Sequence, residues 1–121
     1  MEDDTTNITK LKILVKEFCE KRDWDQYHNP KDLSIGIVTE ASELLQHFRF
    51  KNEEQIKNML DDEKKNEEIT DEVADILYFL LRLAQMYEID LSTVLKRKLE
   101  KNEQRYPVDK VKGLNKKYSE Y

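Results

Sequence analysis

The sequence predicts an all-α fold, and three features of its 121 residues support that prediction. Apolar residues recur every three or four positions along several stretches, which is the spacing of one helix face. Only two glycines and two prolines occur, so few turns are available. Charged residues make up 39% and hydrophobic residues 38%, a balance typical of helices with a solvated outer face. The length favours a single domain.

The first quarter of the chain predicts one helix and a turn. We expect residues 1–6 to be disordered. A helix is predicted over residues 7–22, because Asn7 or Thr6 can cap its start and an apolar stripe follows. Residues 23–30 break the helical period and end in an Asn-Pro pair, which is typical of a turn that leads into the next helix.

The middle of the chain predicts two long helices. The first covers residues 31–48. A polar stretch, residues 51–67, follows; it could hold a short helix over residues 53–60, although its charge density favours a solvated connection. The second long helix covers residues 68–87, and its middle is apolar on nearly every side. Such a helix is central in a fold or buried by a partner subunit.

A last helix is predicted up to residue 105, where Pro107 stops it. The helical domain therefore spans residues 7–107, and residues 108–121 form a C-terminal tail. Helices joined by short or polar connections predict a four-helix bundle. The excess apolar surface predicts that homo-oligomerisation completes this bundle.

Composition excludes several classes of protein. The net charge is −5, and no basic face with interleaved aromatic residues suits a nucleic-acid polymer. No run approaches the length of a membrane span. The acidic N-terminus is unlike a targeting signal, and the single Cys19 is typical of a reduced core thiol. We therefore expect a cytoplasmic protein.

Two pairs of acids border the strongest apolar runs. Glu40 and Glu43 lie one turn apart on the predicted helix 31–48, and Glu72 and Asp75 repeat this spacing on the helix 68–87. If the helices pack side by side, the repulsion among four carboxylates is tolerable only when cations bind. Oxygen ligands favour Mg²⁺, with Mn²⁺ as a possible substitute. The apolar side of the first of these helices consists of Ile37, Val38, Ala41, Leu44, Leu45 and Phe48.

Acid pairs are common in this chain, which contains 26 acids. The same spacing occurs in Glu17 and Glu20, Glu68 and Asp71, and Glu100 and Glu103. The residues alone therefore leave open both a metal site and a non-enzymatic helical interaction module whose acids are solvated. A di-iron bundle fits less well, because such sites use Glu-x-x-His and neither His28 nor His47 follows a glutamate at that distance.

The order of the two acid pairs, Glu-x-x-Glu and then Glu-x-x-Asp, resembles the signature of the MazG-like family of all-α nucleoside triphosphate pyrophosphohydrolases. Three flanking segments are similar to its dCTP pyrophosphatase branch: residues 22–28, 48–51 and 102–107. The resemblance covers residues 11–107. It implies an Mg²⁺-dependent homo-dimer or homo-tetramer that cleaves a nucleoside triphosphate to the monophosphate and pyrophosphate.

The resemblance also implies roles for particular residues. The carboxylates of Glu40, Glu43, Glu72 and Asp75 match the metal ligands and catalytic groups, with Glu43 our first choice as the general base. Substrate contacts are implied for Trp24, His28, Phe50, Lys51, Phe79 and Asn102.

Some of these residues have structural alternatives. Trp24 could stack on a base or simply hold the first helix against the bundle. His28 could bind substrate or form hydrogen bonds with the backbone of the turn. Lys51 could bind phosphates or be an ordinary surface charge. Phe50 and Phe79 stand where relatives carry Trp and Tyr, so the base preference is open. We expect a dNTP substrate, with dCTP or a modified dCTP first and a broad-specificity housecleaning activity as the alternative.

Overall fold

The computed structural model describes residues 1–120, and helices are the only regular structure in that range. The α-helices are α1 (Ile8–Glu20), α2 (Pro30–Phe48), α3 (Glu53–Asp61), α4 (Glu63–Met86), α5 (Leu91–Arg105) and α6 (Val108–Val111). Short 3-10 helices cover η1 (Asp25–Tyr27) and η2 (Tyr118–Glu120). The predicted all-α fold is confirmed. Among residues 1–120, every helix is too short or too polar to cross a membrane.

Side-chain caps fix where the helices begin. Asn7, Asn29 and Asp90 each accept a hydrogen bond from the backbone N–H three residues on, at 2.9, 2.9 and 3.1 Å. Each bond satisfies a donor that has no partner inside the helix. Pro30 occupies the first helical position after Asn29, where its missing N–H costs nothing. The helix start predicted at the Asn-Pro pair is confirmed.

The polar stretch over residues 51–67 is mostly helical rather than a solvated connection. It contains the whole of α3, and α4 begins at Glu63, five residues before the predicted start. Asn52 and Gln55 form a reciprocal capping box at the start of α3, and Asp62 caps α4. These local hydrogen bonds outweigh the charge density, because they satisfy the exposed backbone donors at both helix starts.

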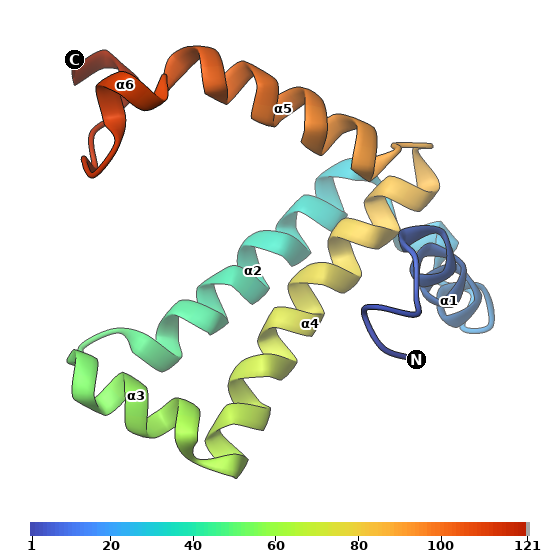
Figure 1. The fold of residues 1–121 in the computed structure, drawn as a ribbon. Helices are drawn as coiled ribbons and strands as arrows, with labels where there is room; N and C mark the ends of the chain where they lie inside the picture. Colours follow the sequence, from blue (N-terminus) through green and yellow to red (C-terminus); the bar gives the residue numbers. More distant parts are fainter. Residues whose placement is uncertain (121) are drawn as a thin grey trace. The chain divides into compact units, whose positions relative to one another are not determined.

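The structure divides into two compact units, Met1–Glu88 and Ile89–Tyr121. In the first unit, α4 is the central helix: α2 packs along it, and α1 and α3 also contact it (Figure 1). Gly36 permits a close approach of α2 to α4, because a Cβ atom there would lie 2.6 Å from Cε1 of Phe79. The second unit consists of α5, α6 and η2.

Residues 2–5 form a hydrogen-bonded turn, in which the Thr5 N–H donates to the Glu2 carbonyl at 3.1 Å. The expected disorder of residues 1–6 and the expected domain limits, 7–107 with a tail at 108–121, stay predictions.

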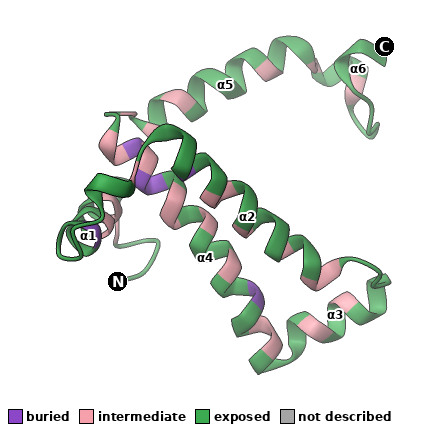
Figure 2. Ribbon diagram, turned by 180° about the vertical axis from the view of Figure 1, so that it is seen from behind, coloured by how far each residue is buried: buried purple, intermediate pink, exposed green. Residues whose placement is uncertain are grey.

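The core of the first unit is small, and its few buried positions are separated by exposed and half-buried residues (Figure 2). Cys19 is fully buried, as predicted for a core thiol. The predicted burial of Val38, Ala41 and Leu45 is wrong within one chain, since Ala41 is exposed and Val38 and Leu45 are 68% and 63% exposed. The reason is that α2 contacts α4 through a narrow strip and no other helix of the unit covers its far side. The other large apolar residues that are exposed on α2 and α4 are Ile35, Val73, Leu77 and Leu80.

Candidate functional site

Three carboxyl groups meet where α2 faces α4. One oxygen atom from each of Glu40, Glu43 and Glu72 lies within 4.8 Å of the others. The spacing of three residues puts Glu40 and Glu43 on neighbouring turns of α2, and the packing of α4 places Glu72 opposite them. Asp75, the fourth predicted ligand, is exposed and lies outside this group of three, although its negative charge acts on Glu40.

These carboxyl groups, the acidic cluster, have one basic neighbour, because Nε2 of His47 lies 4.0 Å from Oε1 of Glu72. Among residues 1–120, the Oε2 atoms of Glu40 and Glu72 are buried and have no hydrogen-bond partner. Burial raises the pKa of Glu40 to about 7, with further contributions from hydrogen bonding to Glu43 and Glu72 and from the charges of Glu43 and Asp75. Carboxylate oxygens are the donors that Mg²⁺ prefers, so the cluster fits a hard divalent cation.

A cavity of about 590 Å³ adjoins the acidic cluster. It is lined by Glu43 and Glu72 and also by Lys51 and Lys65. The Lys65 ammonium pairs with the carboxylate of Glu68 at 3.3 Å. Such a mixture suits an anion that binds together with a cation. Sequence reasoning missed Lys65, because it assigned that residue to a solvated connection. The lining is completed by Gln46, His47 and Met59.

Trp24 and His28 lie on the segment between α1 and α2. Their rings make an edge contact with centroids 6.3 Å apart, and Trp24 makes a second edge contact with Phe18 at 5.7 Å. The contact with Phe18 ties this segment to α1, as the stapling alternative expects. The indole nevertheless stays 37% exposed, which leaves part of the ring available for stacking on a base.

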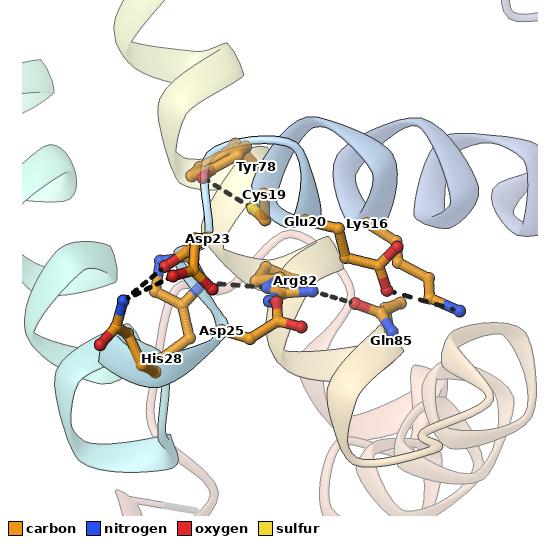
Figure 3. Close-up of polar contacts among 10 residues, drawn as sticks. Lys16, Cys19, Glu20, Asp23, Asp25, His28, Tyr78, Arg82 and Gln85 are labelled. Carbon is orange, nitrogen blue, oxygen red and sulfur yellow. Dashed lines mark hydrogen bonds and ion pairs between the residues drawn. The ribbon is translucent and has the colours of Figure 1, made fainter.

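A buried arginine fixes this segment to α4 (Figure 3). Arg82 is 1% exposed, and its Nε donates to Nδ1 of His28 at 2.9 Å. Its Nη1 donates to Oε1 of Gln85 at 2.6 Å, and its Nη2 forms an ion pair with Asp25 on η1. Sequence reasoning missed this cluster, although a single basic residue inside the apolar run of residues 76–84 was an available signal.

The remaining predicted contact residues lie in different places. Phe79 is half-buried, with its ring over Gly36 and 5.0 Å from the Tyr78 ring. Phe50 follows α2 in a left-handed conformation with φ 64° and is 88% exposed. Asn102 is half-buried on α5, in the second unit.

One chain does not gather these contacts around one point. Trp24 and His28 precede α2, whereas Phe50 and Lys51 follow it. The 19 residues of α2 span about 28 Å at 1.5 Å per residue. The two pairs therefore lie beyond opposite ends of one helix.

Comparisons with known proteins agree with this architecture. The family model of the MazG-like family matches residues 35–121. dCTP pyrophosphatase 1 of Rattus norvegicus is 32% identical over 113 residues, which cover 93% of this chain and 66% of that protein. The Homo sapiens protein of the same name is 29% identical over the same shares, so the chain spans about two thirds of the length of these curated relatives.

A solved structure is also similar. The crystal structure of a pyrophosphatase from Archaeoglobus fulgidus superimposes with a TM-score of 0.76 and is 36% identical; the match covers 83% of this chain and 92% of that one. The family match covers residues 35–121, which is most of the chain. The chain therefore belongs to the MazG-like family, in the branch of the dCTP pyrophosphatases.

Proposed function

We propose that this protein is a divalent-cation-dependent nucleoside triphosphate pyrophosphohydrolase, with dCTP or a modified dCTP as its preferred substrate. It cleaves the bond between the α and β phosphates and releases the monophosphate and pyrophosphate. The observation that carries the proposal is the group of three carboxyls within 4.8 Å, beside a cavity that also contains Lys51 and Lys65. The names of the relatives, dCTP pyrophosphatase 1 and pyrophosphatase, support the same reaction.

The side chains of the acidic cluster, together with Asp75, would hold Mg²⁺, with Mn²⁺ as a substitute. Such a cation, when bound, neutralises the triphosphate, polarises the α-phosphorus and lowers the pKa of the attacking water. Lys51 and Lys65 would hold the β and γ phosphates, which leave as pyrophosphate. Glu43 lines the cavity and would take the proton of the water as general base.

The nucleoside would be held by Trp24, His28, Phe50, Phe79 and Asn102. Because α2 separates the first pair of these residues from Phe50, one nucleotide can reach both only when two copies of the chain contribute. We therefore propose a homo-dimer or homo-tetramer. The exposed apolar side chains of α2 and α4, such as Val38 and Leu77, support this arrangement because they offer a surface for a second copy.

Mixed oligomers test the shared site. Trp24→Ala and Lys51→Ala are each expected to lose activity as homo-oligomers. When the two are co-expressed, about a quarter of the sites of a two-fold dimer should carry both native residues and regain activity. An oligomer that regains none would place both residues in one chain's site and contradict the sharing.

The broad-specificity housecleaning activity is the second candidate. It is favoured by the exposure of Phe50 and by the missing phenol at Phe79, because both changes weaken directional recognition of a base.

Pyrophosphate release from a panel of ribo- and deoxynucleoside triphosphates, with Mg²⁺ and with EDTA, tests both candidates. Metal-dependent release mainly from dCTP or its 5-modified forms supports the first candidate. Similar kcat/KM values for purines and pyrimidines would replace it with the second. No release from folded, Mg²⁺-supplied protein would contradict both and favour the non-enzymatic interaction module.

Cys19 bears on where the protein works. It is a free thiol, fully buried, with its Sγ 3.1 Å from the Tyr78 hydroxyl oxygen. Free thiols persist in the reducing cytoplasm. We propose that location for the protein.

A further inference from the structure

Arg82 determines which nitrogen of His28 carries a proton. A guanidinium is always charged and can only donate hydrogen bonds. Its Nε–H points at Nδ1 of His28 at 2.9 Å, so Nδ1 must be the acceptor. The neutral ring then carries its proton on Nε2. A protonated ring would turn a second N–H toward the Nε–H of Arg82, and this contact between two donors is repulsive.

The guanidinium itself cannot rotate away from this position. Gln85 lies three residues along α4 and accepts from Nη1, while Asp25 pairs with Nη2. Each of the three nitrogens of Arg82 therefore has its own partner, and the side chain is 1% exposed. A planar group held on three sides is pre-organised, whereas a flexible lysine would not be.

The neighbouring groups also keep His28 neutral. Burial of the ring lowers the pKa of His28, and the charge of Arg82 lowers it further, against the opposing effect of the Asp25 carboxylate. Among residues 1–120, no partner accepts a hydrogen bond from Nε2 of His28. The segment before α2 therefore offers one oriented N–H donor beside the indole of Trp24.

We propose that Arg82 is a positioning residue, which fixes His28 as the Nε2–H tautomer and so directs a hydrogen-bond donor at an acceptor atom of the bound nucleoside. A carbonyl oxygen, a ring nitrogen or a sugar oxygen fits such a donor, whereas an exocyclic amino group does not. The nucleoside contact rests on the proposed function; the tautomer does not.

The tautomer can be read directly in the free protein. The ¹⁵N chemical shifts of the imidazole nitrogens identify which one is protonated, and a His47→Gln variant assigns the only other histidine. We expect His28 to show a protonated Nε2 and a bare Nδ1. A protonated Nδ1, or a mixture of tautomers in the wild type, would overturn the proposal.

Two substitutions of His28 separate a ligand contact from a structural role. Asparagine places an oxygen near the position of Nδ1 and can still accept from Arg82, whereas glutamine places an amide N–H₂ near the position of Nε2. We expect His28→Asn to raise KM by roughly threefold to tenfold, the effect of one lost hydrogen bond, with kcat within about twofold. His28→Gln should raise KM less than His28→Asn does, because its amide keeps a donor near the position of Nε2 although it gives Arg82 no acceptor at the position of Nδ1. An unchanged KM in the asparagine variant would remove His28 from the binding site.

Arg82→Met tests whether Arg82 fixes the tautomer of His28. If this variant folds, the His28 signals should become a mixture of tautomers, and KM should rise as it does in His28→Asn, with no further rise in the double variant. If it does not fold, Gln85→Leu removes only one partner of Arg82, and an unchanged His28 tautomer is expected because Asp25 still holds the guanidinium. A wild-type spectrum in folded Arg82→Met would contradict the proposal.

The two proposals can fail separately. An inactive wild type with the Nε2–H tautomer would contradict the proposed function but not the role of Arg82 in fixing the His28 tautomer. An active wild type with the other tautomer would contradict the role of Arg82 in fixing the His28 tautomer but not the proposed function.

Discussion

The first unit contains two polar clusters on α4 that differ in how their charges are matched. The Arg82 cluster supplies its own partners: three nitrogens of the guanidinium meet His28, Gln85 and Asp25. The acidic cluster does not, because Glu40 and Glu72 each keep a buried oxygen without a partner among residues 1–120. Buried charges are normally matched. The Arg82 cluster is therefore paired within the fold, whereas the acidic cluster is a group that could hold a metal ion.

The two clusters on α4 should also respond differently to substitution. Glu72 and Arg82 are ten residues apart, about 15 Å along α4. Loss of a partner in the Arg82 cluster should lower stability, while loss of a carboxylate in the acidic cluster should lower activity and relieve repulsion. Variants of the Arg82 cluster should therefore change stability and KM, whereas variants of the acidic cluster should change kcat/KM without a loss of stability.

Removal of one carboxylate from the acidic cluster should have the largest effect. Glu72→Gln keeps the shape of the side chain and removes a charged ligand, so we expect kcat/KM for dCTP hydrolysis to fall by about 10³-fold or more. Thermal unfolding in EDTA should show no loss of stability. The matched control is Asp71→Asn, an exposed acid next to Glu72, which should keep wild-type activity. A folded Glu72→Gln enzyme with full activity would remove Glu72 from the site.

Removal of the arginine should have the opposite signature. Arg82→Met leaves Asp25 and His28 without their partner, and breaking a buried pair of this kind costs about 3–5 kcal/mol. We expect the lower end, about 3 kcal/mol, because Asp25 is 53% exposed and can be rehydrated. Urea unfolding measures the loss. Lys64→Met, an exposed position on the same helix, should change stability by less than about 0.5 kcal/mol.

The acidic cluster was predicted from the sequence, whereas the Arg82 cluster was not. The helices followed from apolar spacing and caps, because both are local properties of the chain. Glu40, Glu43, Glu72 and Asp75 were identified only through their position beside apolar runs and through a family resemblance, since exposed pairs such as Glu17 and Glu20 have the same spacing.

Two of the three Arg82 contacts that sequence reasoning missed join distant parts of the chain, and the third, with Gln85, is local. The bond from Arg82 to His28 joins residues 54 positions apart, and Lys65 reaches the cavity only because α4 begins earlier than predicted. The first fact depends on tertiary packing, whereas the early start of α4 has a local signal, the Asp62 cap. The gathering of Glu72 with the α2 acids depends on how α2 and α4 pack, which the next variant changes.

Gly36→Ala should disturb the acidic cluster from a distance of one turn. The added Cβ would lie 2.6 Å from the Phe79 ring, so the ring or the helix must shift. Overpacking costs about 1–3 kcal/mol, and the better helix propensity of alanine returns up to about 1 kcal/mol. We expect a net loss of about 1 kcal/mol in urea unfolding and a higher Mg²⁺ concentration for half-maximal activity. The double variant Gly36→Ala, Phe79→Ala should lose less stability than the sum of the losses of the two single variants. Strictly additive losses would show that the two residues are not in contact.

The smallest effect is a pH dependence with opposite sign in the two clusters, measured as Tm in EDTA. The pKa of Glu40 is raised from 4.5 to about 7, so the folded state binds this proton more tightly and stability increases as the pH falls from 7 toward 4.5. The pKa of His28 is lowered from 6.5, so the unfolded state takes up that proton first and stability decreases as the pH falls below 6.5. The two slopes partly cancel in the wild type.

Single variants should separate these slopes. Glu40→Gln removes the first, so its Tm should fall between pH 7 and pH 5. His28→Asn removes the second, so its Tm should rise by roughly 2–6 °C over the same range. Asp75→Asn keeps both titrating groups but removes one of the charges that raise the Glu40 pKa, and it should shift the Glu40 transition to lower pH without changing its sign. Parallel profiles for Glu40→Gln and His28→Asn would mean that the two clusters respond to protons alike, and the division between a matched structural cluster and an unmatched ligand site would fail.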